Sequence, residues 1–87
     1  KISNYLSGLP DCWNVKVMSA NKRGTPDILA VINGRFVAIE VKTEKGKASA
    51  IQQAQIRRIQ QAGGVAFIAK SVDEVIENLA ISDIALD

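Results

Sequence analysis

Two acids and one lysine carry the chemistry that this sequence first suggests. Asp27 and Glu40 lie thirteen residues apart, on either side of Asn33-Gly34, the dipeptide most typical of a two-residue type I′ hairpin. Such a hairpin pairs residues whose numbers add up to 67, so Asp27 should face Glu40 with Cβ atoms about 4.5–5.5 Å apart. Lys42 follows Glu40 by two positions and should project from the same face, because strand side chains alternate.

Facing carboxylates need an explanation, because like charges directly opposite one another destabilise a sheet. A divalent cation held by oxygen ligands would remove the repulsion. Taken singly, each acid has a simpler explanation: Asp27 suits a turn after Pro26, and Glu40 could form a salt bridge with Lys42 or Arg35. A salt bridge does not account for two acids that face each other across the hairpin, so the pair indicates a metal-dependent site.

The length and composition narrow the possible classes of protein. A chain of 87 residues with no run of eighteen apolar residues and no signal-peptide pattern is expected to form one soluble, intracellular domain. Its single cysteine, Cys12, and its lack of histidine argue against an internal disulfide and a structural zinc site. Any metal must therefore be bound by oxygen. The small apolar area also favours a dimer.

The charge is unevenly distributed along the chain. Residues 1–62 hold ten Lys and Arg against four Asp and Glu, a net charge of +6. Residues 63–87 hold one Lys against five Asp and Glu, a net charge of −4. The basic part contains the acid pair, as binding to a phosphate backbone requires. Considered alone, this asymmetry is explained equally well by a solvated surface.

The apolar patterns predict alternating helices and strands. We expect a helix at Ile2–Leu9, strands at Trp13–Met18, Ile28–Ile32 and Arg35–Lys42, a helix at Ser49–Ala62, a strand at Val65–Ala69 and a last helix after Ser71. Gly63-Gly64 should end the second helix, and Ser71 should cap the third. The two hairpin strands are so apolar that they should lie buried at the centre. This is an α/β arrangement whose central hairpin carries the acids.

Four short motifs in this order resemble a known family. They are Arg23-Gly24-Thr25-Pro26-Asp27, Glu40-Val41-Lys42, Ser49-Ala50-Ile51-Gln52 and Gly63-Gly64. Together they resemble the virus-type replication-repair nuclease (VRR-NUC) domain of the PD-(D/E)XK nuclease superfamily, over nearly the whole chain. The resemblance implies one nuclease domain at residues 1–87, with a restriction-endonuclease-like core and a mixed central sheet.

The resemblance also implies a catalytic set of Asp27, Glu40, Lys42 and Gln52. Asp27 and Glu40 would bind Mg²⁺ or Mn²⁺ through their carboxylates, and Val41 through its backbone carbonyl. Lys42 would favour hydroxide and stabilise the negative transition state at the phosphate. The simpler alternative for Lys42 is a solvated lysine at the end of a strand.

Gln52 has two competing interpretations. Ser49-x-x-Gln52 is a capping box, in which Gln52 bonds back to the first amide of the helix. However, Gln52, Ile56 and Ile59 form one helical stripe that should face the sheet, and the resemblance places Gln52 near the catalytic lysine. We therefore expect a functional role for Gln52 and a capping role for Ser49.

The expected DNA contacts surround this site. They are Lys22, Arg23 and Thr25 before the first acid, Lys45 and Lys47 after the lysine, and Arg57 on the outward face that it shares with Gln53, Gln60 and Gln61. For Arg57 a solvated position is the alternative.

The function implied is a metal-dependent endonuclease for branched DNA such as four-way (Holliday) junctions. By the same resemblance it would be a homodimer in the cytoplasm of a phage or bacterial host cell. The alternatives are a nuclease for flaps or single-stranded ends and a catalytically silent DNA-binding module. One departure from the family concerns its N-terminal helix, which commonly offers a further glutamate to the metal. Residues 1–10 contain no acid, which leaves a second metal position in doubt.

Overall fold

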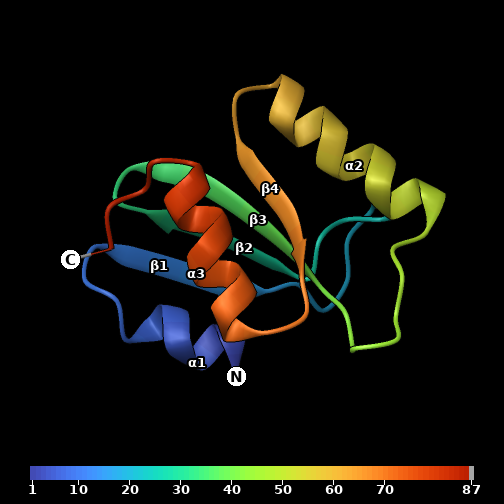
Figure 1. The fold of residues 1–87 in the computed structure, drawn as a ribbon. Helices are drawn as coiled ribbons and strands as arrows, with labels where there is room; N and C mark the ends of the chain where they lie inside the picture. Colours follow the sequence, from blue (N-terminus) through green and yellow to red (C-terminus); the bar gives the residue numbers. More distant parts are fainter. Residues whose placement is uncertain (87) are drawn as a thin grey trace.

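The computed structural model describes residues 1–86. It contains helices α1 (Ile2–Ser7), α2 (Ala50–Gln61) and α3 (Val72–Ile81), and strands β1 (Cys12–Lys16), β2 (Ile28–Ile32), β3 (Arg35–Val41) and β4 (Val65–Ala69). The predicted order of helix, three strands, helix, strand and helix is confirmed (Figure 1).

The four strands form one mixed sheet in the order β1-β2-β3-β4. Strand β2 runs antiparallel to both β1 and β3, whereas β3 and β4 are parallel. A parallel pair needs a crossover connection, and α2 provides it. The α/β fold with a mixed central sheet is the arrangement that the sequence predicted.

The hairpin has the predicted register. Asn33 and Gly34 both have positive φ angles, 50° and 82°, as a type I′ turn requires. Ile32 pairs with Arg35, and the ladder continues to Ile28 opposite Ile39. Asp27 and Glu40 are the next residues on the two strands, at the end of the sheet farthest from the turn.

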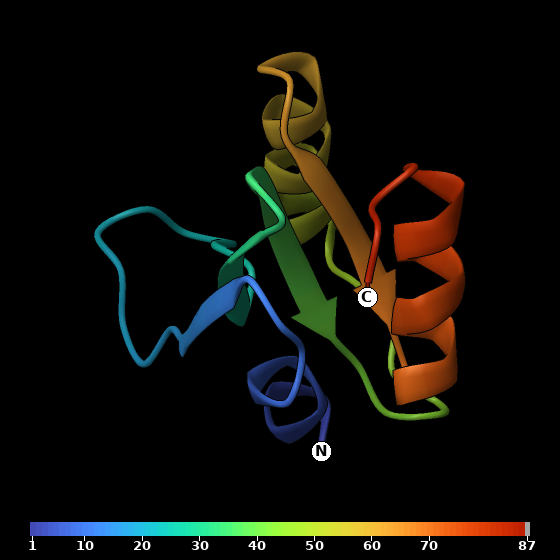
Figure 2. The same ribbon diagram turned by 90° about the vertical axis from the view of Figure 1, so that its left-hand side faces the viewer.

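The helices cover the sheet from two sides. Alternate β3 residues such as Val37 and Ile39 belong to the larger core, together with Leu6 of α1 and Leu79 of α3. Ala38 belongs to a smaller core with Ile56 of α2 and Ala66 of β4. Helices α1 and α3 therefore share one face, α2 lies on the other, and β3 and β4 run between them (Figure 2).

Several element ends differ from the predicted ones. Strand β1 covers Cys12–Lys16 rather than Trp13–Met18, although the Val17 amide still donates to the Asp27 carbonyl oxygen (2.7 Å) in the same register. Strand β3 ends at Val41, before Lys42. The first helix ends at Ser7 rather than Leu9, and Ala62 caps the second helix instead of belonging to it, whereas Ser49 takes the capping position expected of it.

The hairpin strands lie at the centre of the sheet, but they are not buried throughout, which corrects our expectation. Trp13, Val31 and Phe36 occupy one row across β1, β2 and β3, and their exposed fractions are 62%, 42% and 43%. The row lies on the α2 side of the sheet, where α2 packs on β3 and β4. We call these three residues the apolar row.

Over residues 1–86, no helix has the length and hydropathy needed to cross a membrane.

Candidate active site

Asp27 is fixed at the end of the sheet by two hydrogen bonds. Its backbone carbonyl accepts from the Val17 amide, and its carboxylate Oδ2 accepts from the Val41 amide at 2.9 Å. Pro26, directly before it, is fully buried. The carboxylate is thus held against the last residue of β3, beside Glu40.

Glu40 is a buried acid, with 1% of its surface exposed. Its Oε2 lies 3.4 Å from Lys42 Nζ and accepts a hydrogen bond from Gln52 Nε2 at 3.1 Å. Its Oε1 is also buried but has no hydrogen-bond partner among the described residues. Such an atom is costly unless something binds it.

The protonation of Glu40 reflects its neighbours. Burial raises the pKa of its carboxyl group most, and the negative charge of the neighbouring Asp27 raises it further. Lys42 acts in the opposite direction, through a hydrogen bond and its positive charge. The structure therefore brings Asp27, Glu40, Lys42 and Gln52 into one cluster.

Gln52 combines the two interpretations that its sequence context allowed. Its Oε1 accepts from the Ser49 amide at 2.9 Å, and Ser49 Oγ accepts from the Gln52 amide at 3.2 Å, so the capping box is formed. The remaining end of the side chain, Nε2, donates to Glu40. Ile56, one turn later, is buried, so this stripe of α2 does face the sheet.

The donor atoms of the cluster fit a hard divalent cation. No group of three His, Cys, Asp or Glu side chains suited to a metal occurs within residues 1–86, so two carboxylates need a further oxygen. The Val41 amide points toward Asp27, and a strand residue presents its amide and carbonyl to the same neighbour. With the unpartnered Oε1 of Glu40, these oxygens match the preference of Mg²⁺ and Mn²⁺.

The loop before Asp27 is packed against the start of α2. Gly24 has a φ of 78°, and a Cβ there would lie 2.6 Å from Ile51 Cγ2 and 2.9 Å from the Ile51 carbonyl oxygen. Only glycine fits so close an approach. Within this loop Thr25 Oγ1 donates to the Lys22 carbonyl (2.7 Å), and the side chains of Lys22 and Arg23 are exposed.

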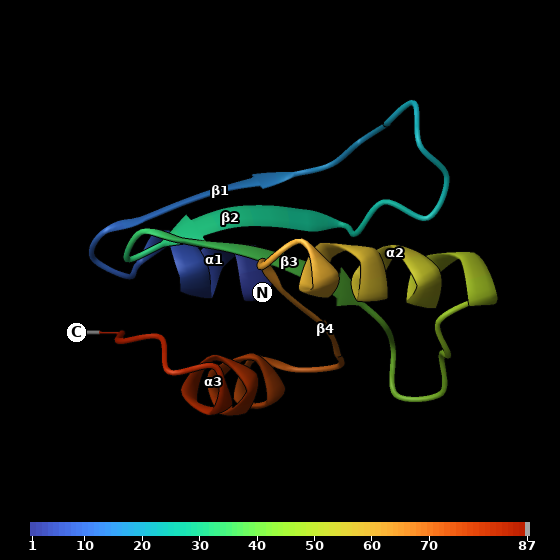
Figure 3. The same cartoon turned by 90° about the horizontal axis from the view of Figure 1, so that it is seen from above.

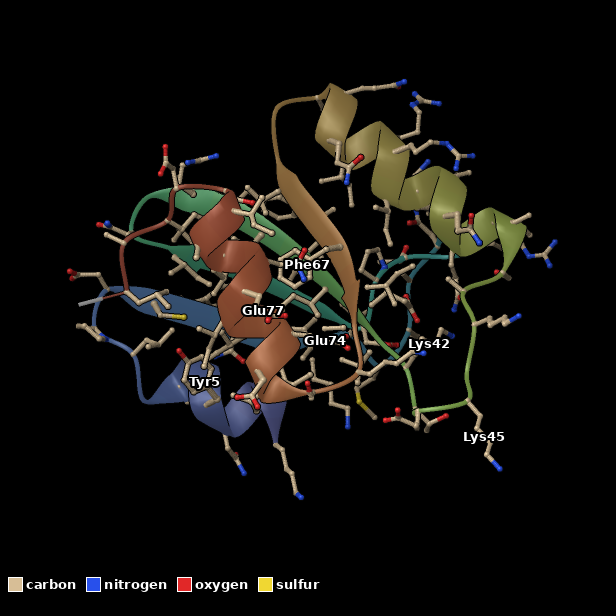
Figure 4. All side chains as sticks on the ribbon, in the orientation of Figure 1. Tyr5, Lys42, Lys45, Phe67, Glu74 and Glu77 are labelled. Carbon is tan, nitrogen blue, oxygen red and sulfur yellow. The ribbon has the colours of Figure 1, made fainter. Side chains whose placement is uncertain are left out.

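The other predicted DNA contacts are exposed, two of them on the loop between β3 and α2 and one on α2. Lys45 and Lys47 lie on the loop between β3 and α2, which extends beyond the sheet on the same side as the β1–β2 loop (Figure 3). Lys42 lies just past β3 beneath α2, while Lys45 points away from the protein (Figure 4). Arg57 is exposed on α2. Gln60, expected to point outward, is exposed, and its Nε2 also donates to the Ala66 carbonyl of β4 at 2.8 Å.

Two lysines near the cluster were missed by sequence reasoning. Lys16, at the end of β1, pairs with Ile28 and so lies next to the Asp27 position. Lys70, directly after β4, reaches the carbonyl of Glu44 with its Nζ at 3.0 Å. Both line a cavity that Asp27 and Val41 also line. No local pattern marks either residue, because their places depend on strand pairing over long sequence separations.

A solved structure described as "VRR_NUC domain" has the same fold as this chain. It matches with a TM-score of 0.75 and 22% sequence identity, over 91% of this chain and 86% of that chain. The expected resemblance to the VRR-NUC domain is thereby confirmed in the fold. Among curated proteins, none matched this sequence.

The family comparison identifies the class of protein more closely. The model of the family described as "Archaeal holliday junction resolvase (hjc)" matches residues 15–85, which include the hairpin, α2, β4 and α3. The cluster of Asp27, Glu40, Lys42 and Gln52 lies inside the matched range. Because the match covers most of the chain, the protein belongs to the archaeal Holliday junction resolvase (Hjc) family, which consists of PD-(D/E)XK-type nucleases.

Proposed function

We propose that this chain is a Mg²⁺- or Mn²⁺-dependent endonuclease that hydrolyses DNA phosphodiesters at four-way junctions. The observation that carries the proposal is the buried Glu40 carboxylate, whose Oε1 has no partner among residues 1–86, placed beside Asp27 and Lys42. A buried, unsatisfied carboxylate next to a second acid is poorly explained by stability alone. It is well explained by a cation.

The carboxylates of Asp27 and Glu40 and the backbone carbonyl of Val41 would hold the cation. When bound, it lowers the pKa of water, polarises the phosphoryl oxygen and stabilises the leaving oxygen. With the cation in place, the charge of Glu40 is balanced from two sides, by the metal and by Lys42.

Lys42 would act on the reacting phosphate. Its Nζ lies 3.4 Å from Glu40, and its side chain is 21% exposed, so the ammonium group is held by the acid and is still open to a substrate. There its charge favours hydroxide over water and stabilises the negative charge that develops on the phosphorus oxygens. Gln52 would orient Glu40 through the hydrogen bond to Oε2.

The distribution of basic residues supports a DNA substrate. Lys22, Arg23 and Thr25 lie on the β1–β2 loop and Lys45 and Lys47 on the β3–α2 loop, and both loops extend from the end of the sheet that carries the acids (Figure 3). Arg57 is exposed on α2. We propose that these residues contact phosphates on both sides of the cut, which positions the strand without reading its sequence. Branched DNA is the substrate that the family's name implies.

We further propose that residues 1–87 form one nuclease domain that acts as a homodimer. The apolar row of Trp13, Val31 and Phe36 supports this, because exposed aromatic and aliphatic side chains in one patch are typical of an interface. A second copy bound on this face by a two-fold axis would bury the same three residues on both chains. Paired sites at a fixed separation suit symmetric cuts in a four-way junction.

The direct test compares DNA substrates and metals. Purified protein should nick a labelled four-way junction with Mg²⁺ or Mn²⁺ and not with EDTA, and it should cut a flap, a single-stranded end and a linear duplex more slowly. Asp27→Asn, which keeps the size of the side chain, should be inactive with either metal. Preferred cutting of flaps or ends would replace the substrate proposal. Tight binding to the junction without cutting would indicate a silent binding module.

A further inference from the structure

A cavity of about 670 Å³ opens beside the catalytic cluster, on the side of the sheet that α1 and α3 cover. It lies between the start of α1, the ends of β1 and β3, and the start of α3. Its polar lining includes Lys16, Lys70, Asp27 and Asp73, and its apolar lining includes Ile28 and Val41. None of the predicted DNA contacts lines this cavity.

The cavity shares two residues with the catalytic cluster. Asp27 and Val41 line it, and they are joined by the hydrogen bond from the Val41 amide to Asp27 Oδ2. Lys42 and Gln52 lie on the other side of this pair, toward α2. The cavity and the cluster are therefore adjacent compartments that meet at the end of β3.

The positive charges of Lys16 and Lys70 are available to bind an anion. Within residues 1–86 the ion pair between Lys42 and Glu40 is the only one, so neither Lys16 nor Lys70 is neutralised by a paired acid. Lys70 Nζ donates to the Glu44 carbonyl, which holds the ammonium group in place and leaves further N–H donors free. Lys1 also lines the cavity.

The start of α3 is not what would attract an anion here. Ser71 Oγ already accepts from the Glu74 amide, and Glu74 Oε1 accepts from the Lys70 amide. Asp73 and Glu74 in the first turn add negative charge. An anion in the cavity would therefore be bound by the lysine side chains.

We propose that this cavity binds a backbone phosphate of the cut strand, next to the phosphate that is hydrolysed, through Lys16 and Lys70. The inference rests on the proposed nuclease function and adds a second contact point to it. With one phosphate at Lys42 and its neighbour in the cavity, the strand crosses the end of β3 in one defined path. That path places the scissile bond at Asp27 and Glu40, which is how contacts away from the reacting atoms contribute to rate.

The test measures how junction binding depends on salt, in EDTA so that no cutting occurs. Each phosphate contact contributes about 0.9 to the slope of log affinity against log salt, so the Lys16→Ala, Lys70→Ala double variant should reduce the slope by about one, and each single variant should reduce it by part of that amount. Lys70→Arg keeps the charge and should restore the wild-type slope. Arg35→Ala removes a positive charge at the opposite end of the hairpin, outside the cavity, and should leave the slope unchanged.

A neutral methylphosphonate link locates the contact on the DNA. The link is placed at each of the two phosphates that neighbour the cut. At the one that enters the cavity it should weaken wild-type binding by about tenfold, as expected for losing a charged hydrogen bond. Binding by the Lys16→Ala, Lys70→Ala double variant should not respond to the same substitution. Melting temperatures near the wild-type value would show that the variants are folded, and Lys16→Gln with Lys70→Gln would replace the alanines if they are not.

The outcomes separate this inference from the proposed function. Folded lysine variants with the wild-type salt slope, and equal sensitivity to the neutral link, would overturn the phosphate site even if the wild type cuts junctions. Reduced slopes in a protein that never cuts would support the phosphate site and count against the nuclease proposal.

Discussion

The side-chain amide of Gln52 joins the start of α2 to Glu40 in β3. Its Nε2 donates to Glu40 Oε2 at 3.1 Å, while its Oε1 accepts from the Ser49 amide at 2.9 Å. Because one end of the amide must accept and the other must donate, its orientation is determined by both partners. The capping box therefore also aims a donor at the buried acid.

This relationship predicts that Gln52→Glu slows cutting without unfolding α2. Glutamate can complete a capping box as glutamine does, but it offers no N–H to Glu40 and adds a negative charge beside it. The single-turnover cleavage rate should fall by about tenfold or more. Gln53→Glu makes the same chemical change on the next residue, which bonds to the Ala48 carbonyl instead, and should leave the rate near wild type. Equal rates for the two variants would contradict the role of Gln52.

The raised pKa of Glu40 predicts how metal-free stability depends on pH. Because the folded protein holds this proton more tightly than the unfolded chain does, the contribution of Glu40 to stability is greatest below the ordinary carboxyl pKa of 4.5 and is lost as pH rises through the higher folded value. Glu40→Gln should lack this fall and be as stable as the wild type, or more stable, at neutral pH. The measurement is the urea midpoint against pH in EDTA. Parallel curves for the two proteins would count against the buried acid pair.

Metal binding should offset the loss of stability that the ionised Glu40 causes. A ligand that binds only the folded state stabilises it by about 2.7 kcal/mol at a concentration of 100 times its Kd, so Mn²⁺ should raise the Tm of the wild type by several degrees. Asp27→Asn and Glu40→Gln should show little or no increase, and Glu44→Gln, a nearby acid outside the cluster, should respond as the wild type does. An unchanged wild-type Tm at millimolar Mn²⁺ would argue against the site.

The apolar row predicts where two copies would meet. Sedimentation at micromolar concentration should give twice the chain mass for the wild type, and Val31→Lys should give a monomer, because a charge at the centre of the row cannot be buried without a partner. Ile81→Lys is the matched control, since Ile81 is 82% exposed on α3 and outside the row. Dissociation by Ile81→Lys alone would move the interface to α3. A monomeric wild type would favour flap or end cleavage.

The parts of this site that could be predicted from sequence depend on local chemistry. Asn33-Gly34 determines the hairpin register because both residues accept positive φ, and that register brings Asp27 beside Glu40. The spacing of Ser49 and Gln52 predicts a capping box and a stripe facing the sheet, and both occur.

The parts that could not be predicted depend on packing between distant segments. The residues between β1 and β2 contain no short turn that fixes a register, so the place of Lys16 beside Asp27 could not be inferred. Lys70 reaches the same cavity through the parallel pairing of β3 and β4. Alternation shows which strand residues share a face, but not which face a helix covers, and this is why Val31 and Phe36 were expected to be buried.

The central claim is that Lys42 acts on a phosphate held at the acid pair, and one assay tests it most directly. Single-turnover cleavage of a four-way junction with Mn²⁺ is compared for the wild type and Lys42→Ala, together with their junction affinities. The wild type should cut, and Lys42→Ala should cut about 10²-fold more slowly or worse while binding almost as tightly, because the outer basic residues remain. A Lys42→Ala protein that cuts at the wild-type rate, or a wild type that binds and never cuts, would contradict the account.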